Sequence, residues 1–285
     1  MKSALSKVAL ILFAAGLLTW VLPAKNAFAN PTAASAPAGV ADSREHCEYS
    51  GDIDGKLRIG MMLVFSKDSN KVSGSYYYAK YLTDIRIEGE VADRTIVIRE
   101  FDSNNVQTGV FRGEFPTKDP RKHYGDSTLT RDVIAGTWSK PDGSASRPFY
   151  VNLSHIFYKS RPQDRYSNAG FDDANVADAF MQKFRSAVLA GEKASVAGMV
   201  SYPIKVRVEG EKDRVSIRNQ EELLNRYDAI FGKKFVEKIA AAVPFHMFSR
   251  SEGVMLGSGE VWIAPLEEKT DKGAKFVPRV IAINN

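Results

Sequence analysis

One five-residue pattern, present four times, constrains the fold of this chain more than any other feature of its sequence. The pattern is hydrophobe-x-Gly-x-hydrophobe, and its copies are Val72-Ser-Gly-Ser-Tyr76, Ile87-Glu-Gly-Glu-Val91, Phe111-Arg-Gly-Glu-Phe115 and Ile134-Ala-Gly-Thr-Trp138. Side chains of a β-strand alternate between two faces, so the glycine and both hydrophobes of each copy share a face. A glycine inside a strand weakens it unless the strand bends or a neighbour packs close to the backbone. The repeats therefore predict a sheet that coils on itself around its glycine-bearing face.

Short alternating segments, separated by polar turns, fill the stretch from residue 45 to residue 157. The segment 57–65 is the clearest, because its hydrophobes fall on one face while Arg58 and Gly60 fall on the other. About eight strands are expected, with no helical period between them. We predict an antiparallel meander that closes into a small barrel, with a β-sandwich as the alternative.

Four tyrosines crowd the stretch 73–81, at positions 76, 77, 78 and 81. Alternation places Tyr76 and Tyr78 on the inward face with Gly74, and Tyr77 on the outward face. Tyr81 joins Tyr77 only if the strand extends that far. We therefore expect core rings and at most two outward rings, rather than one four-ring binding platform.

The N-terminus has the features of a secretion signal. Lys2 and Lys7 precede an apolar run, and Ala27-Phe-Ala29 provides the small-x-small pattern of a cleavage site. The apolar run is about 15 residues, shorter than the roughly 20 that span a bilayer, which argues against an uncleaved anchor. We expect a signal peptide over 1–29, a flexible leader over 30–44, and a periplasmic or secreted protein with no stable membrane span after cleavage.

Bulk charge gives no reason to expect a nucleic-acid partner. The chain has 39 Lys and Arg against 34 Asp and Glu, but Lys2, Lys7 and Lys25 lie in the signal segment, which leaves 36 basic residues after cleavage. A nearly balanced charge does not concentrate polyanions at a protein surface.

The single cysteine, Cys47, cannot form a disulfide within the chain. In an oxidising compartment it would be buried and inert, free, or linked to a partner. Glu45 and Glu48 flank it and disfavour a thiolate, so we do not expect a catalytic cysteine.

After a polar linker over 158–171, the hydrophobic period changes from two to 3.6. A helix is predicted to follow Asp173 and to end at Gly191, and Asn219 with Glu222 forms a capping box for another. The last segments alternate again, beginning with an expected strand over Phe245–Phe248. Residues 172–285 are thus predicted to form an α+β domain with an antiparallel sheet.

Both halves resemble known folds. The first half, on Tyr49-Ser-Gly-Asp-Ile53, Gly74-Ser-Tyr-Tyr-Tyr78 and Ile134-Ala-Gly-Thr-Trp138, is similar to lipocalin- or avidin-like barrels of exported bacterial proteins. The second half resembles the nuclear-transport-factor-2-like fold, also used by polyketide cyclases, in its order of elements and in Gly253-Val-Met-Leu-Gly-Ser-Gly-Glu-Val-Trp262. That resemblance implies a cone formed by a curved sheet and helices, often around a pocket.

Candidate site residues fall in two places. In the expected cone they are Tyr227, His246, Glu260 and Trp262, of which His246 alternates away from Phe245 and Met247 and so faces either the cone or solvent. In the loop 116–132 they are Lys118, Arg121, Lys122, His123 and Tyr124, which form either a solvated insertion or a contact surface for an acidic partner. The spacing singles out no catalytic residue, metal site or cofactor motif.

These observations favour a non-catalytic exported binding or accessory protein of the bacterial cell envelope, with an unidentified protein or small molecule as its partner. One alternative is an inhibitor or immunity protein against an envelope-targeting enzyme or toxin. Another is an isomerase- or hydratase-like enzyme in the C-terminal cone, which would need an acid/base residue beside an oxyanion partner. The sequence leaves the oligomeric state open.

Overall fold

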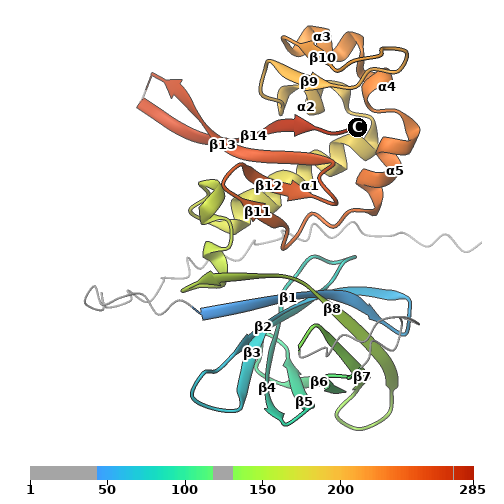
Figure 1. Cartoon of the computed structure of the whole chain (residues 1–285), viewed down its shortest axis with the longest axis vertical. Coiled ribbons are helices and arrows are strands. Elements are labelled where there is room, and N and C mark those ends of the chain that lie inside the picture. The colour runs from blue at the N-terminus through green and yellow to red at the C-terminus, as the bar shows by residue number, and fades with distance from the viewer. Residues whose placement is uncertain (1–43, 118–130, 272) are drawn as a thin grey trace, which may run out of the picture. The chain divides into compact units, whose positions relative to one another are not determined.

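Eight antiparallel strands, each hydrogen-bonded to the next along the chain, close into a barrel (Figure 1). The computed structural model describes residues 44–117, 131–271 and 273–285. The barrel strands are β1 (Arg44–Ile53), β2 (Leu57–Phe65), β3 (Lys71–Tyr78), β4 (Ile85–Ala92), β5 (Thr95–Phe101), β6 (Gln107–Glu114), β7 (Val133–Ser139) and β8 (Ser146–Lys159). β8 returns to pair with β1, so the closed meander is confirmed and the sandwich alternative is wrong.

The repeated glycines let neighbouring strands approach and coil. Gly113 of β6 lies opposite Gly136 of β7. A Cβ on Gly136 would lie 2.5 Å from the Cα of Gly113, and a Cβ on Gly113 would lie 2.9 Å from the Phe149 ring. Since real Cβ atoms do not approach other atoms this closely, only glycine fits where these strands cross the core.

The tyrosines divide between the two faces as alternation predicts. Tyr76 is buried in the barrel core, and Tyr78 packs against that core from the same face. The Tyr76 hydroxyl donates to Glu100 Oε2 at 2.5 Å, and the Trp138 indole N–H donates to the same oxygen at 3.0 Å. Tyr77 points outward, while Tyr81 lies beyond the end of β3 and is 66 % exposed.

The C-terminal region is an α+β arrangement. Its elements are the short turns η1 (Pro162–Asp164) and η2 (Ser167–Ala169), the helices α1 (Ala174–Ala190), α2 (Lys193–Gly198), α3 (Gln220–Asn225), α4 (Tyr227–Ile230) and α5 (Lys233–Ala241), and the strands β9 (Ile204–Val206), β10 (Val215–Ile217), β11 (Phe248–Arg250), β12 (Gly253–Leu256), β13 (Val261–Thr270) and β14 (Gly273–Ile283). The helix predicted after Asp173 is confirmed as α1. The Asp173 carboxylate caps it by accepting from the Asn175 N–H, and Gly191 ends it at φ +69°.

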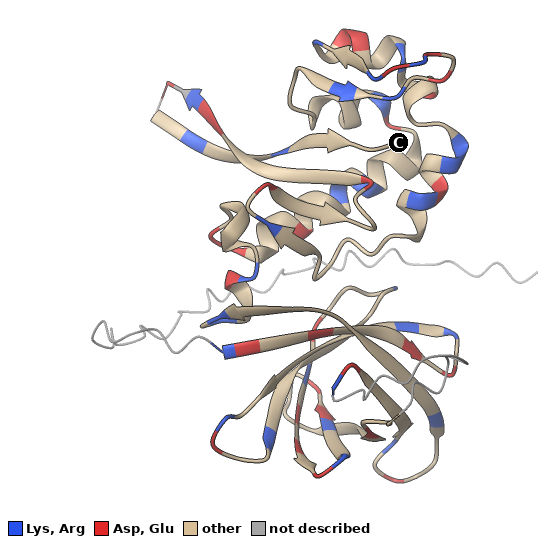
Figure 2. Cartoon of the chain, viewed as in Figure 1, with Lys and Arg blue, Asp and Glu red and all other residues tan. Residues whose placement is uncertain are grey.

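Four of these strands form an antiparallel sheet in the order β11-β12-β13-β14, and β9 pairs with β10 (Figure 1). α1 packs against α2, α5 and β14 around a second hydrophobic core. Residues of both signs are spread over the barrel and the C-terminal region (Figure 2). In the described part of the chain no helix combines the length and apolarity that crossing a membrane requires.

The expected strand over Phe245–Phe248 is wrong, because β11 begins only at Phe248. His246 adopts φ +49°, in the left-handed region, and this turns the chain away from a strand path. A non-glycine residue in that region costs of order 1 kcal/mol or more. Contacts of the His246 side chain with Glu48 and Asp84 hold it there.

Candidate functional site: a buried histidine between two carboxylates

The barrel and the C-terminal region belong to one compact unit, and charged side chains are buried where the two regions meet. Glu48 comes from the outward face of β1, because its neighbours Cys47 and Tyr49 point into the barrel core. Only 4 % of Glu48 is exposed, although it lies on the outside of the barrel. A carboxylate so deeply buried requires compensating partners.

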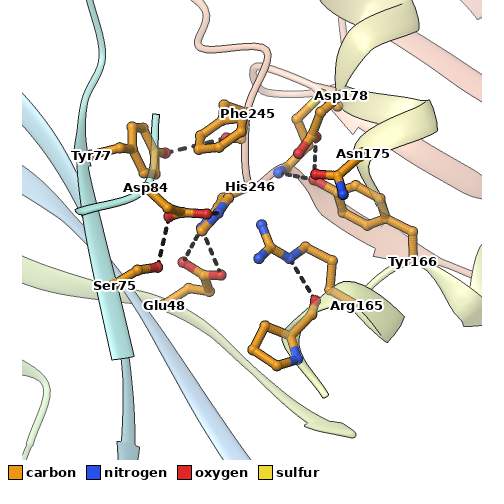
Figure 3. Close-up of polar contacts among 12 residues, drawn as sticks. Glu48, Ser75, Tyr77, Asp84, Arg165, Tyr166, Asn175, Asp178, Phe245 and His246 are labelled. Atoms are coloured by element: carbon orange, nitrogen blue, oxygen red, sulfur yellow. Dashed lines mark hydrogen bonds and ion pairs between the residues drawn. The ribbon is translucent and has the colours of Figure 1, made fainter. Parts of the chain in front are cut away.

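His246 supplies that compensation (Figure 3). Its Nδ1 lies 3.3 Å from Glu48 Oε1 and 3.4 Å from Glu48 Oε2. Its Nε2 lies 3.2 Å from Oδ2 of Asp84, in the connection between β3 and β4, and the Asp84 carboxylate also accepts from the Ser75 hydroxyl at 2.6 Å. Each ring nitrogen of His246 therefore faces its own carboxylate from the barrel.

This geometry favours the imidazolium. Burial by itself would lower the pKa of His246, but the charge of Glu48 and the hydrogen bonds from the ring to Asp84 and Glu48 outweigh burial and raise the pKa to about 9. Burial would raise the pKa of Glu48, yet the charge of His246 and the hydrogen bond from its ring hold it below its usual value. An imidazolium with both N–H groups engaged has no lone pair with which to act as a base.

Aromatic rings pack beside the charged pair. Tyr77, on the outward face of β3, makes edge contacts with the rings of Phe245 and His246, with ring centroids 4.8 and 5.0 Å apart. Its hydroxyl donates to the Phe245 carbonyl at 3.2 Å. On β2, a Cβ at Gly60 would lie 2.4 Å from the Tyr77 ring, so glycine is needed there for the ring to lie flat on the barrel wall. The outward tyrosine thus serves packing against the C-terminal region.

A second buried polar group lies on the other side of His246. The Tyr166 hydroxyl donates to Asp178 Oδ1 of α1 at 2.8 Å and accepts from the Met247 backbone N–H at 2.5 Å (Figure 3). Burial raises the pKa of Asp178 to about 6, since the Tyr166 hydroxyl and the charge of Arg165 offset only part of the desolvation. Asp178 is paired less completely than Glu48.

The outer wall of the barrel and the C-terminal region also enclose a cleft of about 910 Å³. Its polar lining includes Ser50, Arg58, Asn152, Ser154, His155 and Glu260. Its apolar lining includes Phe245, Phe248 and Met255. The cleft has the size and mixed character of a binding site for a small molecule or a short segment of chain.

His155 is a second histidine in the lining of the cleft. Burial lowers its pKa, and although the charge of Glu48 partly opposes that shift, the ring is neutral near pH 7. It makes ring contacts with Phe157 and Phe248, and no hydrogen bond links its nitrogens to another of the residues that the structure describes. A neutral imidazole can both donate and accept toward a ligand.

The structure separates the four candidates of the expected cone. His246 and Glu260 line the same cleft, where Glu260 Oε2 accepts from the Ser258 N–H. Tyr227 is buried in the C-terminal core and stacks on Phe231 with centroids 4.5 Å apart. Trp262 pairs with Met255 across β12 and β13 and is not one of the residues that line the cleft. The loop candidates Lys118, Arg121, Lys122, His123 and Tyr124 lie outside the described residues.

Cys47 is a free thiol buried in the barrel core. Burial is the main cause that raises its pKa to about 12, and Glu45 adds to the shift through its charge and a hydrogen bond from the thiol. The expectation that the flanking glutamates disfavour a thiolate is confirmed. No group of His, Cys, Asp and Glu suited to a metal ion occurs within the described residues.

Sequence reasoning missed Glu48, Asp84, Arg165 and Tyr166. Glu48 and Asp84 lie 198 and 162 positions from His246, and Tyr166 lies 81 positions from Met247. Asp178 gave a usable signal, because it lies on the buried stripe of α1 with Ala174 and Met181 at helical spacing. A carboxylate on a buried helix face indicates a polar site or an ion pair.

Comparisons with known proteins assign no identity to the chain. No family model matches it, and neither the curated proteins nor the solved structures yield a match.

Proposed function

We propose that this chain is a non-catalytic binding or accessory protein of the bacterial cell envelope, and that it holds its ligand or partner in the cleft between the barrel wall and the C-terminal region. The observation that carries the proposal is the cleft itself, about 910 Å³ with polar side chains from both regions around an apolar wall. Such clefts bury most of a small ligand and use a few polar groups to orient it. Export is proposed from the N-terminal signal pattern.

The roles of the titratable groups support binding over catalysis. The ring of His246 is held by two carboxylates, and the raised pKa of Cys47 keeps it a thiol. The imidazolium cannot accept a proton, and a thiol is a far weaker nucleophile than a thiolate near neutral pH.

For the C-terminal region we propose the nuclear-transport-factor-2-like cone. The order of two helices, a strand pair, further helices and an antiparallel strand run supports it. In this arrangement the functional cleft lies outside the cone, against the barrel, since Tyr227 and Phe231 pack into the C-terminal core.

A pair of matched tryptophan substitutions tests the cleft. Ser154 lies in it, whereas Ser144 is exposed on the turn between β7 and β8. Ser154→Trp should abolish capture of small molecules, glycans or proteins from an envelope extract, and Ser144→Trp should capture as the unchanged chain does. Equal capture by both variants, or no capture by the unchanged protein, contradicts the proposal. Fractionation of cells that express the full chain tests export, and retention in the cytoplasm contradicts it.

An isomerase- or hydratase-like activity is the second candidate, favoured by one observation. His155 is neutral, faces the cleft and lacks a hydrogen-bond partner among the described residues, as a general base would. His155→Ala should abolish turnover of a captured small molecule and leave its capture within a few-fold of the original. If the captured molecule is recovered unchanged after incubation with the unchanged protein, the enzymatic candidate is wrong.

A further inference from the structure

A second pocket, of about 310 Å³, lies beside the cleft and shares Phe245 and His246 with it. Its wall comes from β2 and β3, the connection to β4, the η1 turn and the first turns of α1. Its charged and polar lining includes Ser75, Asp84, Arg165, Asn175 and Asp178. This volume is at the lower end of the range for small-molecule sites, so a compact ligand is required.

Arg165 is the unusual feature of this pocket. It is 8 % exposed, and its Nε donates to the Pro162 carbonyl at 3.0 Å. Its two terminal nitrogens make neither a hydrogen bond nor an ion pair with any residue that the structure describes. Figure 3 shows the guanidinium pointing into the space between Glu48, His246 and Asp178. Because the guanidinium lines the pocket and carries a full charge, it is suited to a charge-assisted, bidentate contact with an oxygen ligand.

Asp178 is the corresponding anion in the lining of this pocket. It is 3 % exposed and accepts hydrogen bonds from the Tyr166 hydroxyl and the His246 backbone N–H, but within the described part of the chain no cation lies within ion-pair distance of it. Arg165 lines the same pocket, yet the two side chains form no ion pair with each other. One small pocket therefore holds a cation and an anion, both largely buried, that form no ion pair with each other.

The charges of the neighbours decide which ligand completes this arrangement. Glu48 and Asp84 share the single charge of His246. Arg86, Arg165 and Asp178 line the pocket beside them, so the positive and negative charges of the cluster balance. A simple anion at Arg165 would make the cluster net negative, and a simple cation would leave the guanidinium without an acceptor. A molecule with both charges satisfies both groups and leaves the net charge unchanged.

We propose that this pocket binds a small zwitterion, a free α-amino acid, whose carboxylate accepts from Arg165 and whose ammonium group donates to Asp178. Asn175 and Ser75 lie in the lining to orient the ligand. The inference does not depend on the cleft proposed above, because the Arg165 and Asp178 side chains line this pocket and not that cleft.

Titration calorimetry with the full chain at pH 7, using each common L-amino acid in turn, tests the proposal. At least one amino acid should bind, and its N-acetyl and methyl-ester derivatives should bind at least about tenfold more weakly, because each lacks one of the two charges. If no amino acid binds at millimolar concentration, or if both derivatives bind as tightly as the parent, the proposal is overturned. This arm uses the unchanged protein and needs no variant to fold.

Substitutions in the pocket test whether Arg165 and Asp178 contact the bound amino acid. Arg165→Met and Asp178→Asn should each weaken binding at least about tenfold. The control is Arg161→Met, which removes an exposed arginine paired with Asp164 at 2.7 Å in the same segment and should leave the affinity within about twofold. An equal loss with the control, or unchanged affinity in a folded Arg165→Met or Asp178→Asn protein, would overturn the assignment.

Discussion

Two buried glutamates on the barrel strands are stabilised in opposite ways. Glu100 of β5 points into the barrel and receives hydrogen bonds from the neutral donors Tyr76 and Trp138, both within the same barrel. Glu48 of β1 points outward and is compensated by His246, which lies 198 positions away in the chain. Neutral donors suffice where the barrel itself supplies them, whereas the outward glutamate becomes buried only when the C-terminal region brings a cation. The first contact stabilises the barrel, and the second specifies how the C-terminal region packs on it.

The largest test of this contrast is His246→Ala. Removing the cation leaves Glu48 buried without its ion-pair partner, so the free energy of unfolding should fall by about 3–5 kcal/mol. Urea unfolding followed by tryptophan fluorescence measures it, because Trp138 lies in the barrel and Trp262 in the C-terminal sheet. The matched control is His155→Ala, which removes a ring without hydrogen-bond partners among the described residues and should cost about 1 kcal/mol or less. Equal losses in both variants would refute the distinction.

The pH dependence of stability should also reflect the pairing of His246 with its carboxylates. The pKa of His246 is about 9 in the folded chain, above the ordinary value of 6.5 expected after unfolding. Its contribution is therefore complete below pH 6.5 and should fall by about 3 kcal/mol as the pH rises through 9. Urea titrations at pH 6, 7.5 and 9.5 measure this slope, which should be flatter in His246→Gln. Parallel curves for the two proteins would contradict it.

Acid should destabilise the protein by protonating the carboxylates of Glu48 and Asp84. Burial opposes the charged forms of Glu48 and Asp84, but the partnership with His246 outweighs it and lowers both pKa values. Stability that these groups contribute is present above their ordinary pKa values and is lost as the pH falls through the lowered ones.

Exchanging each glutamate for glutamine compares the two environments directly. Glu48→Gln should destabilise the protein by about 2 kcal/mol and shift the titration of His246 downward, because one of its two carboxylates is neutralised. Glu100→Gln should cost about 1 kcal/mol, since the amide oxygen can still accept from Tyr76 and Trp138. Urea unfolding and NMR titration of His246 measure the two effects. A larger loss for Glu100→Gln than for Glu48→Gln would reverse the comparison.

The smallest expected effect is a gain in stability, from a substitution at Asp178. Because burial raises the pKa of Asp178 to about 6, its ionised form destabilises the fold above that pH. Asp178→Asn keeps an acceptor for Tyr166 and should stabilise the protein by about 1 kcal/mol at pH 8, with no gain at pH 4. Thermal unfolding at both pH values checks the prediction, and a loss at pH 8 would show that the carboxylate is paired after all. A gain in stability together with weaker amino-acid binding is the pattern expected of a functional residue.

The barrel could be predicted from the sequence because the patterns that specify its strands act between residues close together in the chain. Alternation and the repeated glycines act over two to four positions, and they correctly place Tyr76 inside and Tyr77 outside. The site is not local, since Glu48, Asp84 and His246 come from three distant segments, and no spacing rule relates them. Alternation also fails at His246, where the two carboxylates hold a left-handed backbone that hydrophobic periodicity does not encode.

The pairing of His246 with Asp84, 162 positions earlier in the chain, has a consequence for biosynthesis. At about 5–20 residues per second, Asp84 is synthesised roughly 8 to 32 s before the histidine that pairs with it, and the end of β8 roughly 4 to 17 s before it. During that interval Glu48 and Asp84 face solvent, where neither charge is costly. The C-terminal region then encounters a preformed pair of carboxylates, and only the arrangement that places an imidazolium between them avoids burying an unpaired charge. His246, which is synthesised after the barrel, thus favours the correct packing of the C-terminal region on the barrel.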